Sequence, residues 1–361
     1  MKVVAYAYPW DVAEPGFLDR VAELGVDEIA VAVAYHSARA ATPWSASRTS
    51  VLARDAALYR PVRDERWSRL KPAAADWVDS PDSAGEAIAS LDNAAAWLVL
   101  THSSRLGEEF PELAVRNCFG ERYPWALCPA QEEVRDYAVT LTEESLAGLE
   151  VSSVILEACG QLGAVHQCRH EKTDAVWSPA VVRLLSVCCC EACGLESGVD
   201  SALRAEVNRL MATGDDTVRL PADLQATILA GRQRSTDLLR RAVLEKVDAP
   251  VVLHGAVDEW ETGALPGLTP CAAEEVGSVV LPCWQPGATS LDNVRAARSR
   301  YAKAALGAYV TAVGANPAPD MKTYVSELGR AGADQLHLYH LGLAGPARWG
   351  DMQAAVAGAA Q

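Results

Sequence analysis

The sequence lacks the features that mark membrane, secreted and nucleic-acid-binding proteins. No apolar run approaches membrane-spanning length, and no apolar secretory segment follows Met1. Cationic residues are few, because 32 Lys and Arg stand against 47 Asp and Glu and give a net charge of -15. Such a surface repels nucleic acid and anionic membranes. We therefore expect a cytoplasmic protein that binds a small molecule, binds neither nucleic acid nor membrane, and is compatible with assembly into a homo-oligomer.

Glycine-rich phosphate-binding loops are also missing. No Walker or dinucleotide-binding signature occurs anywhere in the chain. The segment after the first strand-like run reads Tyr8-Pro9-Trp10-Asp11, where an open nucleotide-binding sheet would have its glycines. This absence argues against the doubly wound open sheet, which is the alternative fold for a chain of alternating strands and helices.

Strand-like apolar runs and helical patterns are what the chain does contain. The predicted strands are Val3–Tyr8, Ile29–Tyr35, Trp97–Thr101, Val151–Leu156, Pro250–Leu253, Gly277–Leu281, Ala308–Val313 and Gln335–Tyr339. The predicted helices are Pro15–Leu24, Gly85–Ala95, Glu132–Leu149, Ser201–Met211, Asp223–Val247, Asp292–Leu306, Met321–Ala331 and the tail after Met352. Polar sequence at residues 37–79 is predicted to be loop.

This alternation predicts parallel strands joined by crossover helices. Eight such units close most economically into a ring, so we predict an α/β protein with a (β/α)8 TIM barrel. We expect the barrel to form a single domain over residues 1–361, with residues 160–235 as an insertion after the fourth strand that carries the cysteine motif and helices.

Four of the 10 cysteines have the spacing of a metal site. Cys188, Cys190 and Cys193 form a C-x-C-x-x-C motif, and Cys128 precedes Pro129 ahead of a predicted helix. Short spacings let adjacent turns aim several thiolates at one point, and four thiolates saturate tetrahedral zinc without leaving a position for water. We predict a structural Zn2+ on these four residues; buried thiols without metal, or disulfides, are the alternatives.

The residues at the carboxyl ends of the strands are the candidates for a site, because chemistry in a TIM barrel lies there. Glu157 follows the fourth strand, where burial would raise its pKa and suit it to general-acid work. A strand cap or an ion pair with a neighbouring arginine is the alternative role. Aromatic and hydrogen-bonding side chains at the other strand ends would suit a sugar ring. They are Tyr8, Trp10, Asp11, Tyr35, His36, His102, His254, Trp284, Asn316 and His340.

A further polar cluster lies within the insertion and contains His166, His170 and Lys172. The two histidines would share one face of a helix and could bind a metal. We favour a loop over the barrel mouth, in which one histidine or Lys172 contacts substrate.

The Cys128-Pro129 pair and the Cys188–Cys193 motif, with Glu157 between them, resemble the glycoside hydrolase family 42 β-galactosidases over mainly residues 125–195. The resemblance implies a (β/α)8 barrel, four zinc thiolates and Glu157 as the acid/base of a glycosidase. Relatives of the wider glycosidase superfamily carry similar cysteines. One departure is Leu156, which stands where the family has an asparagine.

The second departure concerns the nucleophile, which in the family is a glutamate at the end of strand seven. No carboxylate precedes Asp320 at that position here, so Asp258, Glu259 and Asp320 are candidates for the second carboxylate, with Asp11 as a further one. The sequence thus predicts a glycoside hydrolase acting on a small sugar or glycoside. A sugar isomerase or lyase, or a catalytically inactive carbohydrate-binding barrel, is the alternative.

Overall fold

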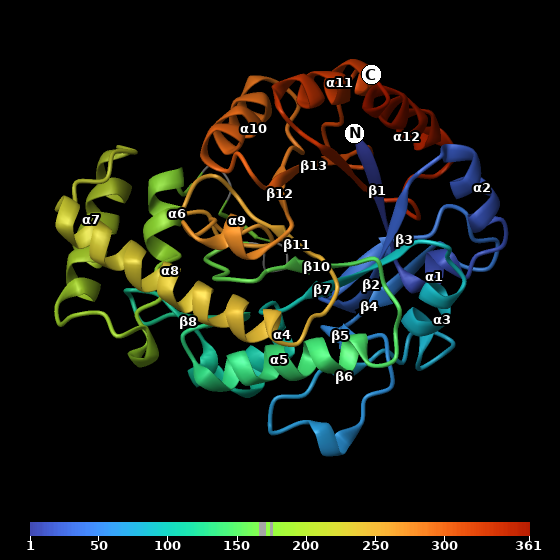
Figure 1. The fold of residues 1–361 in the computed structure, drawn as a ribbon. Helices are drawn as coiled ribbons and strands as arrows, with labels where there is room; N and C mark the ends of the chain where they lie inside the picture. Colours follow the sequence, from blue (N-terminus) through green and yellow to red (C-terminus); the bar gives the residue numbers. More distant parts are fainter. Residues whose placement is uncertain (166–170, 174–175) are drawn as a thin grey trace.

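The structure is a computed structural model that describes residues 1–165, 171–173 and 176–361. Its centre is a closed ring of parallel strands, each paired with the next and the last paired with the first (Figure 1). The ring consists of β1 (Lys2–Ala7), β2 (Glu28–Tyr35), β7 (Ala94–Val99), β10 (Ser153–Glu157), β11 (Val251–His254), β12 (Ser278–Pro282), β13 (Ala305–Thr311) and β14 (Gln335–Tyr339). The predicted (β/α)8 barrel is confirmed.

The barrel strands are apolar on both faces. Every residue of β2 and of β7 is buried, as expected for parallel strands that lie between a core and a layer of helices. Large rings fill the interior, where the ring centre of Tyr6 lies 4.8 Å from that of Trp97 and 5.0 Å from that of Tyr309. The ring therefore encloses a packed core, and a substrate would meet the barrel at its end.

Helices cover the outside of the ring (Figure 1). They are α2 (Phe17–Leu24), α3 (Ser83–Ala89), α5 (Glu132–Leu146), α8 (Ala222–Leu244), α10 (Ala288–Arg300), α11 (Met321–Ala331) and α12 (Pro346–Ala359). Two predicted helices run too far, because Ala94, Ala95 and Leu306 belong to strands. The helix preference of alanine and leucine is a weak signal that pairing with neighbouring strands overrides.

Several short elements were not predicted. The segment predicted as loop contains β3 (Ala38–Ala41), β4 (Ser50–Ala53), β5 (Ala57–Leu58), the 3-10 helix η1 (Asp64–Arg66) and β6 (Ala73–Ala74). Other short elements are α1 (Pro9–Val12), α4 (Ser104–Glu109), η2 (Pro111–Leu113), β8 (Ala114–Arg116), β9 (Arg122–Leu127) and α9 (Ala272–Glu275). Strands of two to four residues offer too few positions for an alternating pattern to be recognised.

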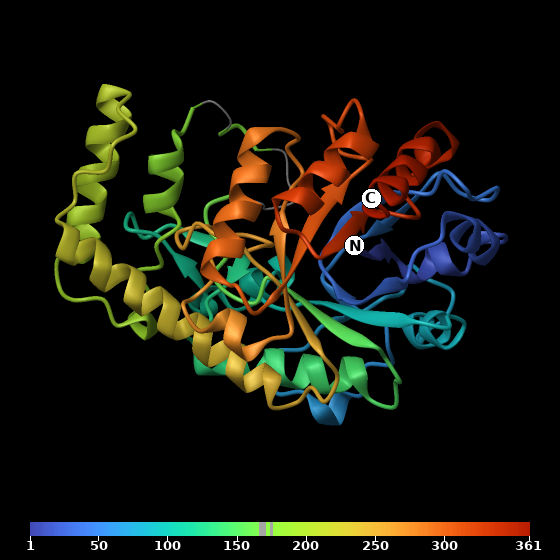
Figure 2. The ribbon, with the colours of Figure 1, turned by 45° about the horizontal axis from the view of Figure 1, so that its top comes forward.

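The long segment after β10 carries α6 (Pro179–Leu185), the 3-10 helix η3 (Glu191–Cys193), α7 (Val199–Thr213) and α8. Figures 1 and 2 show α6 and α7 standing to one side of the barrel, with α8 leading back to it. The predicted boundary at residue 235 falls inside α8, which is the crossover helix between β10 and β11. No helix in the described ranges is long and apolar enough to cross a membrane.

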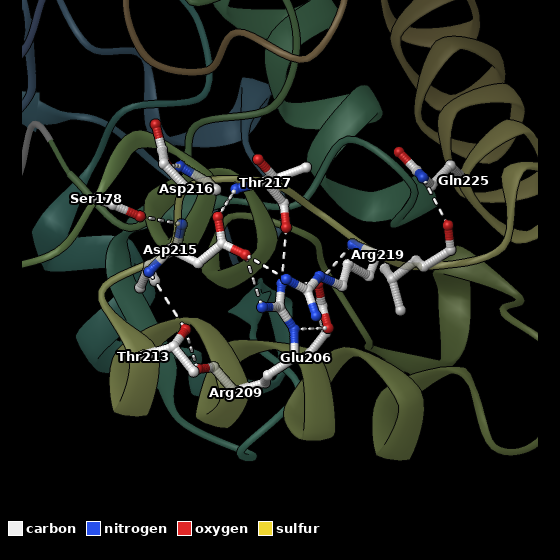
Figure 3. Close-up of polar contacts among 12 residues, drawn as sticks. Ser178, Glu206, Arg209, Thr213, Asp215, Asp216, Thr217, Arg219 and Gln225 are labelled. Atoms are coloured by element: carbon white, nitrogen blue, oxygen red, sulfur yellow. Dashed lines mark hydrogen bonds and ion pairs between the residues drawn. The ribbon is translucent and has the colours of Figure 1, made fainter.

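An ion-pair network holds α7 against the turn that precedes α8 (Figure 3). Arg209 donates to Glu206 at 2.7 and 2.8 Å and lies 3.0 Å from Asp215, which also pairs with Arg219 at 3.0 Å. Carboxylates shared between arginines in this way fix the direction of the turn. This turn is what brings the chain from the outlying helices back onto the barrel.

Candidate functional site

Glu157 is the last residue of β10, and its carboxyl group points into the barrel core. The Nε1 atom of Trp97 donates to Oε2 at 2.8 Å, and Nδ1 of His254 lies 3.5 Å from the same oxygen. The other oxygen, Oε1, has no hydrogen-bond partner in the described part of the chain. Burial raises the pKa of Glu157 to about 8, although the bond from Trp97 opposes this rise. At neutral pH the group therefore holds its proton, as a general acid must.

A chain of hydrogen bonds runs from His254, beside Glu157, toward the opposite end of the barrel. The Nε2 atom of His254 lies 2.8 Å from the hydroxyl of Tyr6, which lies 2.8 Å from Nδ1 of His337. The Nε2 atom of His337 is 3.0 Å from the side-chain oxygen Oε1 of Gln335, the first residue of β14, which accepts a hydrogen bond from this ring. Burial lowers the pKa of His254 to about 3 and that of His337 well below its usual range, so both rings are neutral.

Aromatic rings from β1, α1 and β2 gather at the carboxyl end of the barrel. Tyr8 stacks on Trp10 with ring centres 4.5 Å apart and meets Tyr35 edge-on at 5.2 Å. Its hydroxyl lies 3.3 Å from that of Tyr339 at the end of β14. These predicted site residues are brought together, although Tyr8, Trp10 and Tyr35 are each almost fully buried.

Trp284 extends this aromatic group toward solvent. Its ring centre lies 5.5 Å from that of Tyr309 and 5.2 Å from that of Tyr339, and 41% of the residue is exposed. An exposed indole that rests on the buried Tyr309 and the half-buried Tyr339 is a surface on which an apolar sugar face could stack.

Three predicted histidines border the same aromatic group. His36 stacks between Tyr35, at 4.3 Å, and His102, at 4.5 Å between ring centres. His340 lies 4.3 Å from the ring of Tyr8, and neither of its buried nitrogens has a hydrogen-bond partner in the described ranges. Burial lowers the pKa of His340 to about 3, so its ring is neutral at physiological pH.

Asp11 is a second buried carboxyl group at this end of the barrel. Its Oδ2 atom accepts a hydrogen bond from the backbone nitrogen of Tyr8 at 2.9 Å and lies 3.7 Å from Nδ1 of His340. Burial raises the pKa of Asp11 to about 7. Gly342 packs so closely that a Cβ atom there would lie 1.9 Å from the carboxyl carbon, so only glycine permits this approach.

The other three acidic candidates are engaged away from this group. Asp258 pairs with Arg183 at 2.7 Å with its side chain 47% exposed, and Glu259 pairs with another arginine. Asp320 caps α11 by accepting a backbone N–H at its first turn. No hydrogen bond or ion pair joins any of the three to Glu157 within the described ranges.

The remaining predicted contacts lie in loops. Asn316 is exposed in the loop after β13, and Lys172 is exposed in the segment after β10. His166 and His170 lie outside the described residues. The structure thus brings the strand-end aromatics and histidines around Glu157 but does not draw Asn316 into that cluster.

The four predicted metal ligands come together in one cluster. The sulfur of Cys193 lies 3.6 Å from that of Cys128 and 3.6 Å from that of Cys190, and the Cys190 and Cys128 sulfurs are 3.8 Å apart. All four sulfurs, including that of Cys188, lie within 4.8 Å of one another. A tetrahedron with zinc–sulfur bonds of about 2.3 Å has edges of about 3.8 Å. The donor set and its spacing therefore fit a four-thiolate zinc ion.

Neighbouring N–H groups point at these sulfurs. The backbone nitrogen of Arg116 donates to the sulfur of Cys188 at 3.4 Å, and the side-chain amide of Gln131 donates to that of Cys190 at 3.8 Å. Such bonds stabilise thiolates and hold them in place around a metal. The cluster links the start of α5 to the segment around η3, which are far apart in the sequence.

Comparison with known proteins reveals relatives by fold. No protein-family model matches the chain, and no curated protein matches its sequence. The catalytic domain of the beta-amylase from Paenibacillus polymyxa has a TM-score of 0.57 at 11% identity, covering 100% of this chain and 99% of that one. A beta-galactosidase from the psychrophilic Marinomonas ef1 gives 0.48 at 12% identity, covering 99% of this chain and 59% of its own.

An alpha-galactosidase from Geobacillus stearothermophilus, solved with raffinose, gives a TM-score of 0.42 at 11% identity and covers 99% of this chain and 41% of its own. These three structures are glycoside hydrolases by name. At 11% identity the likeness to the beta-amylase domain establishes the barrel fold alone.

Several residues that surround Glu157 were not among the predicted site residues. Tyr6, Trp97, Tyr309, His337 and Tyr339 all lie within barrel strands and face its interior. One signal was available, because a histidine in the middle of an apolar strand is rarely placed there without a hydrogen-bond partner. The tyrosines and Trp97 look like ordinary core residues in the sequence. They come close to Glu157 only because the strands close into a ring.

Proposed function

We propose that the protein is a glycoside hydrolase-like enzyme that acts on a small sugar or glycoside, with Glu157 as the general acid. The observation that carries this proposal is the Glu157 carboxyl group at the end of the fourth barrel strand, with one oxygen held by Trp97 and the other without a partner among the described residues. Its pKa of about 8 keeps it protonated at neutral pH. Cleavage of a glycosidic bond needs such a group to protonate the leaving oxygen.

Asp11 is the candidate that the surroundings favour as the second carboxylate. It is buried beside the same aromatic group, whereas Asp258, Glu259 and Asp320 are held in ion pairs or a helix cap. Burial raises the pKa of Tyr339, and the charges of Glu157 and Asp11 raise it further, as expected if this tyrosine lies near both. In this assignment Asp11 would act on water or on the sugar while Glu157 protonates the leaving group.

The substrate would be held by the aromatic and histidine side chains at the barrel end. Trp284 supplies an exposed stacking surface beside Tyr339, and the other strand-end residues would shape the subsite below it. The predicted contacts are Tyr8, Trp10, Tyr35, His36, His102, His166, His170, Lys172, His254, Asn316 and His340.

The four-cysteine cluster would hold a structural zinc ion. With four thiolates the metal has no open position for water, so it would crosslink two distant segments of the chain and take no part in the reaction. Its contribution would be to fix the long segment between β10 and β11 that borders the barrel end.

A sugar isomerase or lyase is the second candidate. The observation that favours it is the close approach of Glu157 to the neutral ring of His254, 3.5 Å away, since a carboxyl–imidazole pair can also move protons between carbon and oxygen. Such an enzyme would convert a free sugar but leave an aryl glycoside intact.

Hydrolysis of aryl glycosides by the purified protein tests the proposal. Glu157→Gln should lower kcat by about 100-fold or more, because positioned acid–base groups contribute about 10²–10⁴ in rate. Glu28→Gln is the matched control, since Glu28 is equally buried in a barrel strand but lies at the opposite end, where it pairs with Lys2. Full turnover by the Glu157→Gln variant would remove this residue from the mechanism.

A further inference from the structure

A cavity of about 270 Å³ lies beside the first helices of the chain, outside the ring of strands. Residues of α1, α2 and α3 line it, together with the segment before α3 and the turn between β3 and β4. α1 contacts both α2 and α3, and Figure 1 shows the three helices on the same side of the barrel. The volume is close to the lower limit of ligand pockets, about 300 Å³, so the cavity would hold one small molecule.

Three side chains that line this cavity carry a buried polar atom without a hydrogen-bond partner in the described part of the chain. The atoms are Nε1 of Trp10, Nε of Arg48 and Oγ of Ser83. The two nitrogens can only donate, and the serine hydroxyl can donate as well. Buried polar groups without partners are rare in folded proteins, so three of them around one cavity point to a missing acceptor.

The charge of Arg48 is only weakly compensated. Its Nη2 atom lies 3.7 Å from Oε1 of Glu14, and no hydrogen bond joins these two side chains within the described ranges. Both side chains are partly buried, which shields them from water. A guanidinium group presents a planar fork of N–H groups that matches the two oxygens of a carboxylate. A carboxylate is therefore the acceptor that suits Arg48 best.

The remaining wall decides what else the ligand carries. Most of it is formed by the apolar residues Pro9, Val12, Ala13, Leu18, Val78 and Ala87. A sugar would bury several hydroxyls against these side chains without partners, which is costly. The exposed acids Asp79 and Glu86 also border the cavity and would repel a doubly charged phosphate, which a single arginine does not neutralise. A molecule with one carboxylate and an apolar body meets both conditions.

We propose that this cavity binds a small monocarboxylate with an apolar body, and that Arg48, Trp10 and Ser83 donate to its carboxylate. The site is separate from Glu157, and the inference does not depend on the proposed glycosidase activity. Trp10 belongs to both regions, because its ring stacks on that of Tyr8 with ring centres 4.5 Å apart. A ligand in the cavity would therefore contact a residue of the aromatic group at the barrel end.

Titration of the purified full-length protein with benzoate tests the proposal. In 15N-labelled protein, the indole N–H signal of Trp10, assigned by its loss in Trp10→Phe, should shift progressively and saturate. We expect a Kd of about 1 mM or lower, as is ordinary for a ligand of about nine non-hydrogen atoms. Benzyl alcohol has the same ring without the charge, and it should bind at least about tenfold more weakly.

Arg48→Met removes the charge and the N–H groups but keeps an unbranched side chain, so the Kd for benzoate should rise by about tenfold or more. Arg39→Met is the matched control, because Arg39 is an exposed arginine of the same hairpin, in β3, and does not line the cavity. It makes the same change in net charge and should keep the wild-type Kd. Calorimetric titration gives each Kd without relying on the Trp10 signal.

The outcomes decide the proposal in either direction. Saturable binding that is weakened in Arg48→Met and kept in Arg39→Met supports a carboxylate site in this cavity. Absence of benzoate binding, equal affinity for benzyl alcohol, or tighter binding of inorganic phosphate overturns it. Comparison of these three probes needs the wild-type protein alone, so it decides even if a variant fails to fold. Hydrolysis of aryl glycosides is measured separately, and its failure would leave this site untouched.

Discussion

Among single residues, Glu157 is the carboxylic acid that burial keeps neutral. Glu157 is only 4% exposed, and within the described part of the chain the indole of Trp97 is its one hydrogen-bond donor. A single neutral donor does not replace the hydration that a carboxylate loses inside a protein, so the protonated form is favoured. The environment therefore keeps the proton on Glu157 at neutral pH, as the proposed role of proton donor requires.

This burial predicts how stability depends on pH. The folded protein retains the Glu157 proton up to a pKa of about 8, while the unfolded chain loses it near the ordinary glutamate value. Between these values the folded state binds more protons, so this residue makes stability fall as pH rises, and the fall levels off above pH 8. Glu157→Gln lacks this contribution.

Melting curves of wild type and Glu157→Gln should therefore be similar near pH 5 and diverge as pH approaches 8, with the variant more stable by on the order of 4 kcal/mol. Other buried groups titrate in both proteins and cancel in the comparison. A difference that stays constant from pH 5 to pH 8 would mean that Glu157 is ionised in the folded protein.

Among the elements, the cysteine cluster joins two segments that do not belong to a common helix or sheet. Cys128 follows β9, and the other three ligands lie around η3, beyond β10 and α6. A metal ion bound there would close this loop only in the folded state, and it would therefore stabilise the folded chain. The cluster would thus hold in place a segment that regular secondary structure leaves unpaired.

Cys190→Ser should release the metal and lower the melting temperature, and zinc measured in the purified protein should fall from about one ion per chain to a small fraction. Cys189→Ser is the matched control, because the Cys189 sulfur faces the backbone oxygen of Val187 at 3.8 Å and is not part of the cluster. Wild-type protein purified without any bound metal would contradict the zinc assignment.

The elements also show what the sequence could predict. All the barrel strands were predicted because parallel strands covered by helices are nearly continuous apolar runs, as in the Glu28–Tyr35 strand. The cysteine cluster was predicted because three ligands lie within six residues, Cys188–Cys193. The short strands between residues 37 and 79 were missed because their pairing partners, not their own sequences, define them.

The candidate site was only partly predictable. Glu157, Asp11 and the aromatic rings were predicted because they follow predicted strands. A residue that follows a strand of a parallel barrel lies at the carboxyl end of that barrel. The partners of Glu157 were missed, because Trp97 and Tyr6 face inward from within strands. Which side chains they meet depends on the register between the eight paired strands. No local pattern encodes that register.

At the scale of the whole molecule, the two ends of the chain complete the barrel. β1 is held between β2 and β14, and the backbone amine of Met1 donates to the carbonyl of Ala359 at 2.7 Å. The last helix, α12, packs against α11 and also against β1, so it covers the seam where the ring closes. Closure of the ring is what brings Tyr6 from β1 and His337 from β14 together.

Removal of residues 346–361 should therefore expose the apolar seam and cost more stability than a loop deletion of similar length. Thermal unfolding should become broad and shift to lower temperature, with dye binding to the exposed surface, since packing of one apolar helix face contributes several kcal/mol. A truncated protein with wild-type melting behaviour would show that the ring closes without this helix.

If Glu157 is a neutral acid at the end of the barrel, its own titration will show it. In protein labelled with 13C at the glutamate side-chain carboxyl, one resonance absent from Glu157→Gln should titrate with a pKa of about 8. The same value should appear as the alkaline limb of kcat/KM for an aryl glycoside. A Glu157 resonance that titrates near pH 4.5, as an exposed glutamate does, would contradict the account.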